Sequence, residues 1–410
     1  MNILFIAKDP PWPPMGGASL RAYHFIRALS QNHRVALVCY ATVRQEIAMG
    51  HAPPDWQCSV HVIPPPSGKG SIERAILAFS GDIPDVVYRN TSPAMVQMVD
   101  SLLVAEDWDV VHLVGLEMAS AMLPRHWTAF ARGGPKIVLD AQNVEHRLQS
   151  QASTVARRKL STWPAGAYSW LQSRKLKEYE AAVCRFAGGL ITVSPEDRRA
   201  LQDLLPGKQV TVVPNGVDTQ RYCPDGPRNK RPHSRLLFTG TMDYRPNVDA
   251  AQWFARDVLP LIIGAAPSAR FTIAGRNPTP SVCALAGPHV EVTGTVDDDL
   301  PYFRNTSVFV LPMRFGGGSR LKLLQAMACG LPVVTTTAGA AGIPVQHGKH
   351  IWIADAPKDF AGAVCRLLRD RETGRALGAA ARELALEYDW RECTRLLESL
   401  YQTLVKQPVT

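Results

Sequence analysis

Short apolar runs rich in β-branched residues recur along this chain, and segments with helical spacing separate most of them. The runs are NILFIA, RVALVCYA, SVHVIP, DVVHLV, KIVLDAQ, GLITVS and VTVVPN, followed after residue 234 by RLLFTGTM, RFTIAG, VEVTG, VFVLPM, LPVVTTT and IWIAD. Strands that are apolar on both faces are typical of parallel sheets covered by helices on each side. The pattern therefore predicts α/β architecture with two doubly wound parallel sheets.

A polar stretch separates the two series of strands. Residues 215–234, NGVDTQRYCPDGPRNKRPHS, are rich in proline, glycine and charge, which is typical of a linker. A chain of 410 residues is also longer than one hydrophobic core usually supports. We expect a first domain over residues 1–208, a second over 209–385 and a terminal helix within 386–410.

Composition narrows the classes of function. The eight cysteines show no paired spacing, which argues against a disulfide framework or a zinc site and favours the reducing cytoplasm. The net charge of +9 suggests an anionic partner, but no basic block or recognisable module points to nucleic acid. No apolar run approaches the roughly eighteen residues of a membrane-spanning helix, and the opening NILFIA is interpreted as a strand rather than a signal peptide.

The segment RFGGGSRLKLLQAMACG, residues 314–330, predicts a ligand-binding helix. Its three glycines allow backbone amides to approach a ligand, Ser319 can cap the helix, and a helix start favours anions. Arg320 and Lys322 add positive charge there, and Lys322 and Gln325 form a polar stripe on an otherwise apolar helix. A surface helix end with Lys and Gln pointing to water is the competing interpretation, but the combined pattern favours a ligand contact.

This segment resembles the donor-binding helix of the group 1 glycosyltransferases (family 4), which have the GT-B fold. Four other pieces resemble the family in the right order: PPMGGASLRAYHFIRAL near the start, PNGVD at 214–218, GTMDYRPNVDA at 240–250 and VTGTVDDDLPYF at 292–303. The resemblance covers almost the whole chain. It implies two Rossmann-like domains facing a central cleft, with the terminal helix crossing back to the first domain.

The resemblance also implies an activity. A family member would be a retaining glycosyltransferase that holds a nucleotide-sugar donor on the second domain and an acceptor on the first. No metal or other cofactor is expected, since the nucleotide-sugar is a substrate. The acceptor stays unidentified and could be a glycan, a lipid-linked molecule or a small molecule.

The resemblance implies a donor-binding role for particular residues of this chain. The glycine loop before the first helix would approach the diphosphate or the transferred sugar, and the loop after VEVTG would lie against the nucleobase. Arg320 and Lys322 would hold the diphosphate, and Gln325 would meet the ribose hydroxyls. The expected donor-binding residues are Gly16, Gly17, Arg245, Gly294, Thr295, Val296, Gly317, Gly318, Ser319, Arg320, Lys322 and Gln325.

Two features depart from the family pattern. The Arg and Lys that clamp the diphosphate in many members correspond here to Thr241 and Pro246, with Arg245 as a nearby replacement. The family's paired glutamates correspond to Gly317 and Gln325. A glutamine keeps the geometry of an acceptor, so we expect Gln325→Glu to change donor binding only modestly. The chain represents a divergent branch, and the identity of the donor is not inherited.

The first half supplies catalytic and acceptor-side candidates. His112, near the end of DVVHLV, would lie beside the transferred sugar, although a core histidine is almost as well supported. Asp140, Asn143 and Glu145 could bind sugar or acceptor hydroxyls, or cap the following helix. We expect no metal site at Asp297–Asp299, because acidic residues at a helix start cap it and complement its dipole.

Residues 156–180 combine cations with Trp163, Tyr168 and Trp170. They could contact a lipid-linked acceptor or dock on an anionic membrane, which would place a cytoplasmic protein at the inner face of the membrane. A solvated helix with packed aromatics is slightly favoured. Three other functions stay open: an epimerase-like enzyme for sugar nucleotides on the same fold, a non-catalytic nucleotide-sugar-binding protein and a membrane-surface protein.

Overall fold

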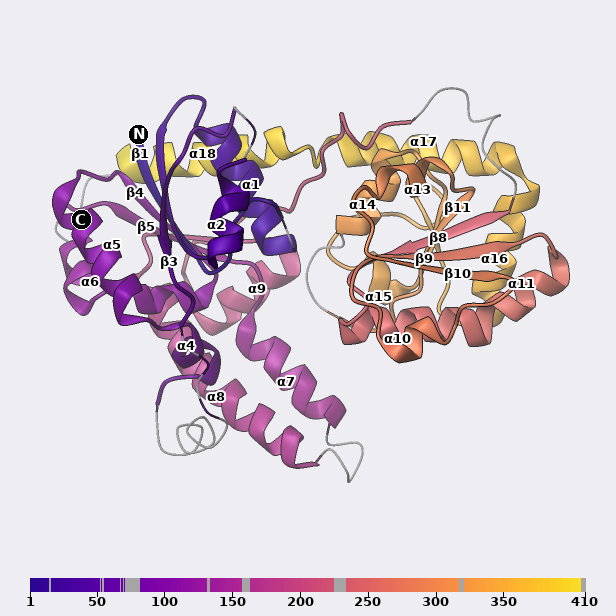
Figure 1. Ribbon diagram of the computed structural model, residues 1–410, viewed down its shortest axis with the longest axis horizontal. Helices are drawn as coiled ribbons and strands as arrows, with labels where there is room; N and C mark the ends of the chain where they lie inside the picture. Colours follow the sequence, from indigo (N-terminus) through magenta and orange to yellow (C-terminus); the bar gives the residue numbers. More distant parts are fainter. Residues whose placement is uncertain are drawn as a thin grey trace. The chain divides into compact units, whose positions relative to one another are not determined.

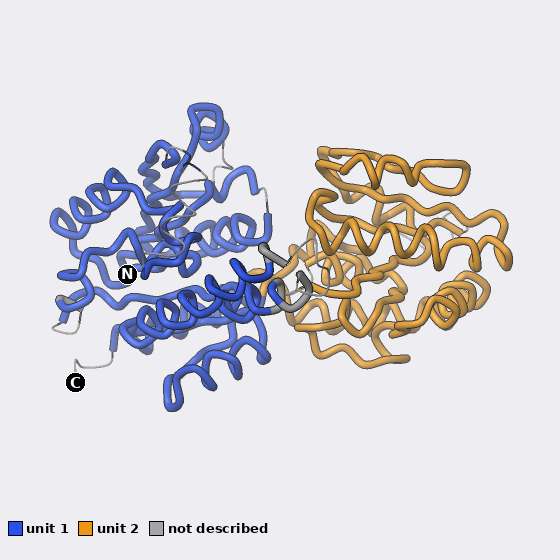
Figure 2. Tube along the Cα trace, turned by 90° about the horizontal axis from the view of Figure 1, so that it is seen from below, with its two compact units in different colours: residues 1–214, 393–410 blue, residues 215–392 orange. Residues whose placement is uncertain are grey.

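The computed structural model describes residues 1–410 except 15, 52, 54, 67, 69, 71–81, 131–132, 157–162, 225–233, 317–320 and 407–410. The chain divides into two compact units, shown in different colours in Figure 2. The first comprises Met1–Pro214 with Cys393–Thr410, and the second comprises Asn215–Glu392. Each unit is built around a parallel sheet flanked by helices, as the strand pattern predicts (Figure 1).

The first unit contains a seven-stranded sheet in the order β3-β2-β1-β4-β5-β6-β7. Its central strands are buried along nearly their whole length, which explains their continuous apolar sequences. Phe5 of β1 pairs with Leu37 on one side and with His112 on the other, so His112 lies in the middle of the sheet. The strands are β1 (Asn2–Ala7), β2 (Arg34–Tyr40), β3 (Ser59–Ile63), β4 (Val110–Val114), β5 (Lys136–Ala141), β6 (Gly189–Thr192) and β7 (Thr211–Val212).

Helices flank this sheet, and α7 and α8 form a hairpin that projects from it (Figure 1). The helices are α1 (Gly17–Leu29), α2 (Val43–Met49), α4 (Asp85–Asn90), α5 (Pro93–Ala105), the 3₁₀ helix η1 (Leu116–Ala121), α6 (Pro124–Phe130), α7 (Glu145–Ala156), α8 (Trp163–Phe186) and α9 (Pro195–Leu204). The terminal helix α18 (Trp390–Lys406) belongs to the first unit from Cys393 onward. The first unit extends to Pro214 rather than to 208, because β7 pairs with β6.

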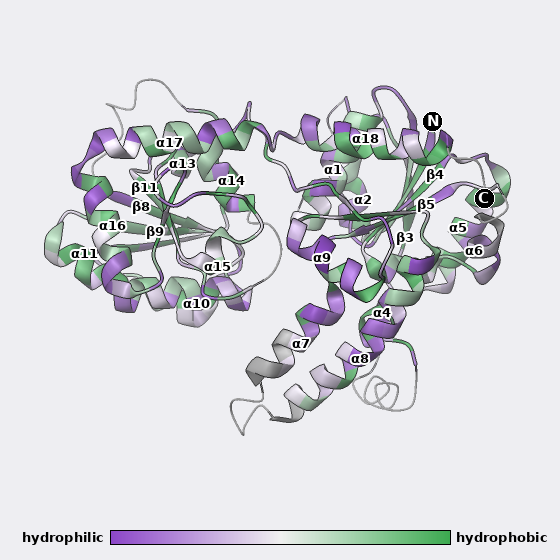
Figure 3. Ribbon diagram, turned by 180° about the vertical axis from the view of Figure 1, so that it is seen from behind, coloured by the Kyte–Doolittle hydropathy of each residue, from purple (hydrophilic) through white to green (hydrophobic). Residues whose placement is uncertain are grey.

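The second unit contains a six-stranded sheet in the order β10-β9-β8-β11-β12-β13. Its strands are β8 (Arg235–Thr239), β9 (Arg270–Ala274), β10 (Val290–Gly294), β11 (Val308–Leu311), β12 (Val333–Thr335) and β13 (Trp352–Ile353). Its helices are α10 (Arg245–Trp253), the π-helix η4 (Phe254–Val258), α11 (Leu259–Ala265), α12 (Pro280–Cys283), α13 (Leu300–Arg304), α14 (Leu321–Ala328), α15 (Thr337–Ala340), α16 (Pro357–Arg369) and α17 (Arg371–Leu386). The strands are mainly hydrophobic, whereas the helices carry both hydrophobic and hydrophilic residues (Figure 3).

A buried polar network connects the layers of the first unit. Arg21 of α1 donates from Nε to Asp140 Oδ2 of β5 at 2.7 Å, and both side chains are only 1% exposed. Arg21 also donates from Nη1 to the carbonyl oxygen of Pro214 at 2.9 Å. The Tyr401 hydroxyl of α18 lies 2.6 Å from His112 Nδ1 on β4. The network therefore connects α1, β4, β5 and α18 with Pro214, where the first stretch of the first unit ends.

We predict that Arg21→Met lowers the free energy of unfolding by about 3–5 kcal/mol, because it leaves the Asp140 carboxylate buried without its counter-charge. Urea denaturation measures the loss. Arg147→Met is the matched control, since Arg147 pairs with Asp203 at the surface, where the side chains are 52% and 71% exposed. That change should stay within about 1 kcal/mol. Equal losses in the two variants would contradict a special role for the buried pair.

Candidate functional site

Three neighbouring strands of the second sheet end at glycines with positive φ. These are Gly240 after β8 (φ 153°), Gly275 after β9 (φ 153°) and Gly294 at the end of β10 (φ 72°). A Cβ atom at Gly275 would collide with the carbonyl oxygen of Gly240, so no other residue fits there. Thr295 and Val296 follow directly, exposed and half-buried respectively. This is the carboxyl edge of a parallel sheet, where ligands of such domains bind.

Lys322 of α14 brings a positive charge to this edge. Its Nζ donates to Asn247 Oδ1 at 2.7 Å and lies 4.7 Å from the centre of the Phe238 ring. Asn247 is buried and donates from Nδ2 to the carbonyl oxygen of Thr241 at 2.9 Å, which fixes the orientation of its amide. A Cβ atom at Gly240 would lie 2.6 Å from the Lys322 ammonium. The glycine is therefore needed where the lysine side chain ends.

Arg276 is a second cation at this edge, and the sequence interpretation missed it. It follows Gly275 directly and donates from Nε to Thr241 Oγ1 at 3.3 Å. A cation immediately after the strand RFTIAG is the signal that could have identified it. Arg245, which the sequence suggested as a substitute for the missing clamp, is exposed at the start of α10, with its guanidinium 5.9 Å from the centre of the Phe315 ring.

The structure confirms α14 as a mostly buried helix with a polar stripe. Lys322 and Gln325 are half-buried, whereas Leu323, Leu324, Ala326, Met327 and Ala328 are fully buried. The helix ends as predicted at Gly330, whose φ is 62° and whose N–H donates to the carbonyl oxygen of Met327. The predicted contacts Gly317, Gly318, Ser319 and Arg320 lie outside the described residues.

Gln325 belongs to a hydrogen-bonded chain that the sequence did not reveal. Its Nε2 donates to the Tyr222 hydroxyl at 2.8 Å, and that hydroxyl donates to Asp299 Oδ1 at 2.7 Å. Tyr222 comes from residues 215–234, which were predicted as a linker, yet its side chain is only 8% exposed in the second unit. Arg382 of α17 donates to the main-chain oxygen of Tyr222 at 3.2 Å. Tyr222 therefore holds a defined position beside α14.

Two residues of the acidic run Asp297–Asp299 have partners within the protein. Asp298 accepts the N–H of Leu300 at 3.0 Å, as expected at the start of α13, and it pairs with Arg221 at 2.6 Å. Asp299 accepts from Tyr222. In the part of the chain that the structure describes, no group of three or more His, Cys, Asp or Glu side chains could hold a metal ion.

A cavity of about 150 Å³ lies at the carboxyl edge of the first sheet. The ends of β1, β4 and β5 and the start of α1 line it, and its polar residues are Lys8, Asp9, Ser19, Glu117, Gln142, Asn143 and Glu145. The glycine loop directly precedes the lining residues Ala18 and Ser19: Gly16 caps α1 with its N–H donating to Ser19 Oγ at 2.9 Å, and Gly17 is the first residue of that helix. The structure thus brings Asn143 and Glu145 together and adds Glu117, which the sequence did not single out.

Carboxyl groups dominate the electrostatics of this cavity. Burial, reinforced by the nearby carboxylates of Glu117 and Glu180, raises the pKa of Glu145 to about 7. Burial also raises the pKa of Glu117. Asn143 donates to Glu145 Oε1 at 3.4 Å, and Glu180 accepts the N–H of Glu145 at 3.1 Å. Carboxyl groups that keep a proton near neutral pH can both donate to and accept from hydroxyl groups, so the cavity suits a hydroxyl-bearing ligand.

His112 and Asp140 do not line the cavity but belong to the buried polar network. His112 is 0% exposed, and its Nε2 lies 3.6 Å from Asp140 Oδ2. Burial lowers the pKa of His112 and raises that of Tyr401, so the phenol keeps its proton and donates it to Nδ1 of a neutral imidazole. The structure therefore supports the core-histidine interpretation over a catalytic one. Asp140 likewise serves the interior, as the partner of Arg21, rather than an acceptor.

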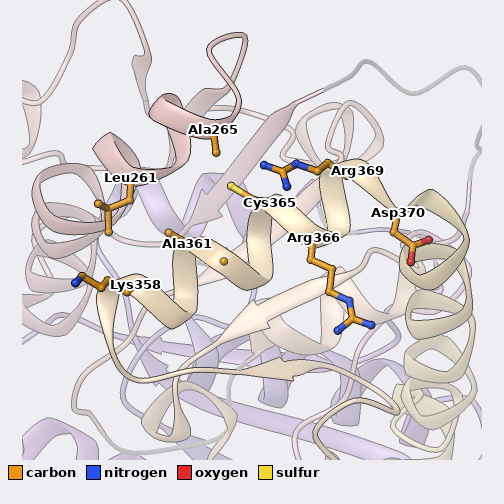
Figure 4. A pocket seen from close by; sticks show the side chains of 9 residues that line it. Leu261, Ala265, Lys358, Ala361, Cys365, Arg366, Arg369 and Asp370 are labelled. Atoms are coloured by element: carbon orange, nitrogen blue, oxygen red, sulfur yellow. The ribbon is translucent and has the colours of Figure 1, made fainter.

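A second hollow, of about 540 Å³, lies on the second unit (Figure 4). Leu261 and Ala361 contribute apolar surface, and Lys358, Arg366 and Arg369 contribute cations. Its lining residues come from α11, α16 and the residue that follows α16, and none comes from a strand end. The hollow is therefore not part of the candidate site at the sheet edge.

Comparison with known proteins identifies the family. The chain belongs to glycosyltransferase family 4, whose model matches residues 15–221, and the model for group 1 glycosyl transferases matches residues 233–370. Glycogen synthase of Mycobacterium tuberculosis is 24% identical over 422 aligned residues, which cover 98% of this chain and 94% of that protein.

Solved structures share the fold. Sucrose-phosphate synthase from Thermosynechococcus elongatus matches with a TM-score of 0.71 and 17% identity over 98% of each chain. Anabaena HepE in complex with UDP-glucose matches with a TM-score of 0.63 and 15% identity over 98% of this chain and 100% of that one. The fold is GT-B and the protein is a glycosyltransferase, which confirms the resemblance. Among the described residues, no helix is long and apolar enough to cross a membrane.

The raised pKa of Glu145 predicts a stability change with pH. Its pKa is about 7 in the folded protein against an ordinary value of 4.5, so the folded state keeps a proton that the unfolded state releases. Stability from this group is therefore lost as pH rises between about 4.5 and 7. Glu145→Gln removes the titration, and its melting temperature relative to the native protein should be higher at pH 8 than at pH 5. The exposed Glu178→Gln should show the same difference at both pH values; an equal response by Glu145→Gln would contradict the assignment.

Proposed function

We propose that this enzyme transfers a sugar from a nucleotide-sugar donor to a hydroxyl group of an acceptor, with retention of anomeric configuration and without a metal ion. The donor binds at the carboxyl edge of the second sheet and the acceptor at the cavity of the first unit. The single observation that carries the proposal is the placement of the Lys322 ammonium against the glycine strand end at Gly240. A cation held at a glycine strand end is suited to a diphosphate.

The cations at this edge can replace the family's missing clamp. Thr241 cannot bind a phosphate by charge, but it accepts a hydrogen bond from Arg276, which keeps that guanidinium at the end of β9. Lys322 stands at the end of the neighbouring strand β8. Two cations on adjacent strand ends can stabilise a diphosphate leaving group electrostatically, which is the role a metal ion plays in other transferases. The UDP-glucose complex of the similar HepE structure supports a nucleotide-sugar as donor.

The acceptor remains open because related proteins use different ones. The names of two similar proteins, glycogen synthase and sucrose-phosphate synthase, indicate a polysaccharide and a sugar phosphate as products. The cavity beside Asn143 and Glu145 is the place on the first unit where acceptor or sugar hydroxyls would bind. Gly16 and Gly17 would approach the same ligand through their main chain.

A peripheral contact with the inner face of the membrane, or with a lipid-linked acceptor, is a further part of the proposal. It is supported by α8, where Trp170 is 46% exposed and the Arg174 guanidinium lies 5.2 Å from the centre of its ring. An aromatic side chain beside cations on a helical surface suits an anionic headgroup region. Residues 157–162 of the predicted segment lie outside the described residues.

We predict that Lys322→Ala weakens UDP binding at least about tenfold, because a charge-assisted hydrogen bond contributes about 1.5–3 kcal/mol. Isothermal titration calorimetry with UDP, GDP, ADP, CMP and TDP selects the nucleotide and measures the loss. Lys358→Ala removes a lysine from the α11–α16 hollow instead and should leave the affinity unchanged. If Lys358→Ala weakened binding and Lys322→Ala did not, the donor site would have been placed wrongly.

The reaction itself tests the proposal. With the nucleotide-sugar that the binding panel selects, we expect slow donor hydrolysis in the presence of EDTA and an initial product with the anomeric configuration of the donor. Proton NMR of the released sugar distinguishes the two anomers before they equilibrate. Inversion would exclude the retaining mechanism, and activity that requires added Mg²⁺ or Mn²⁺ would exclude the metal-free one.

A further inference from the structure

The two hydrogen bonds that connect Gln325, Tyr222 and Asp299 run in one direction, from Gln325 to Tyr222 and from Tyr222 to Asp299. This direction follows from the number of protons that the three groups carry. A phenol carries one proton, and an ionised carboxylate can only accept. The Tyr222 hydroxyl must therefore give its proton to Asp299, 2.7 Å away, and can only accept from Gln325, 2.8 Å away. The group that faces Tyr222 must be the Gln325 amide nitrogen, and the carbonyl oxygen Oε1 is directed elsewhere.

The surroundings keep this direction stable. Burial raises the pKa of Tyr222, and the carboxylate of Asp299 raises it further, so the phenol stays protonated. Burial also raises the pKa of Asp299, but the Arg221 guanidinium, 3.8 Å from Asp299 Oδ1, opposes that shift and favours the ionised carboxylate. The Phe303 ring packs edge-on against the Tyr222 ring with centroids 5.6 Å apart, and Arg382 holds the main chain of the tyrosine. A donor that is itself bonded to a charge is polarised, which strengthens the bond that it accepts. The amide of Gln325 is therefore held by a rigid neighbour and not by solvent.

The other end of the amide is available to a ligand. Within the described part of the chain, Gln325 Oε1 accepts no hydrogen bond from a protein group, and the side chain is half-buried. Gln325 lies one helical turn beyond Lys322, on the same side of α14, and Lys322 marks the proposed diphosphate position. A carbonyl oxygen at this place can accept from a hydroxyl group but cannot donate to one.

We propose that Tyr222 and Asp299 act as positioning residues that orient the Gln325 amide, so that its carbonyl oxygen accepts a hydrogen bond from a ribose hydroxyl of the donor. The inference rests on the proposed function, because it needs the donor to lie beside α14. The ribose contact of Gln325 is what the family resemblance already implies; the new inference is that Tyr222 and Asp299 determine which atom of the amide makes that contact.

This arrangement revises the expectation for a glutamate in place of Gln325. The single variant Gln325→Glu would have two carboxylates around one phenol proton, so it should weaken donor binding rather than preserve it. Adding Asp299→Asn would relieve the conflict, because an asparagine amide can donate to the Tyr222 oxygen while the phenol donates to the new carboxylate. The direction of the whole chain would reverse, and an acceptor atom would still face the ribose.

The test compares UDP with 2′-deoxy-UDP and 3′-deoxy-UDP by calorimetry on the full chain, or the corresponding series of whichever nucleoside diphosphate the panel selects. We expect the native protein to prefer the complete ribose by about three- to tenfold over one of the deoxy forms, the value of one hydrogen bond. Gln325→Ala should bind the complete and the deoxy nucleotide equally well. Tyr222→Phe should reduce the ratio of the two affinities at least twofold, and its affinity for the deoxy nucleotide should equal that of the native protein. Tyr302→Phe is the matched control on the neighbouring helix α13 and should keep the native preference.

The double variant makes the inference falsifiable even if Tyr222→Phe fails to fold. Gln325→Glu should weaken UDP binding about tenfold, and Gln325→Glu with Asp299→Asn should recover most of that loss together with the preference for the complete ribose. A purely structural role would give additive losses instead. Additive losses, or an unaltered ribose preference in Tyr222→Phe, would overturn the inference while leaving the donor site in place. If the native protein bound none of the nucleoside diphosphates, the proposed function would fall and this inference with it.

Discussion

The buried ion pair between Arg21 and Asp140 is the interaction on which the first unit depends. Removing two charges from water is costly, so such a pair persists only where further hydrogen bonds complete it. Here Pro214 supplies a carbonyl oxygen to Arg21, and His112 faces Asp140 from the next strand. The pair ties α1 to the centre of the sheet. It therefore also holds the first turn of α1, with its glycine loop, at the cavity where Glu145 lies.

The second unit depends on close contact between neighbouring strand ends rather than on a buried ion pair. Gly240 and Gly275 let adjacent strand ends come within contact distance, and the Lys322 side chain ends in the space that a larger residue at 240 would fill. Thr241 then anchors Arg276. Two cations therefore lie at the same sheet edge, Arg276 directly after β9 and Lys322 on α14.

The two units show which structural features can be predicted from the pattern of residues along the chain. Strand runs, helix ends and the polar stripe of α14 follow from local periodicity, and the structure has them where the sequence predicts. The sequence grouped Asn143 and Glu145 with Asp140 at the end of one strand, and the structure places Asn143 and Glu145, but not Asp140, at one cavity. Arg276 and Tyr222 were missed, since their importance comes from neighbours 35 and 103 residues away in the chain. The surroundings of His112 could not be predicted for the same reason, because Tyr401 reaches it from a helix at the opposite end of the chain.

The amino-acid sequence by itself determined that the chain forms two parallel α/β units with glycine-rich strand ends, since buried strands need apolar residues on both faces and tight turns need glycine. It also determined the family. The tertiary structure alone decided which polar residues are buried partners and which lie at a cavity or a sheet edge. The sequence around a histidine or a glutamine has the same pattern whether the side chain is a buried partner or a ligand contact. Its role is settled by whether a partner such as Tyr401 or Tyr222 lies within hydrogen-bonding distance, and only folding brings those residues together.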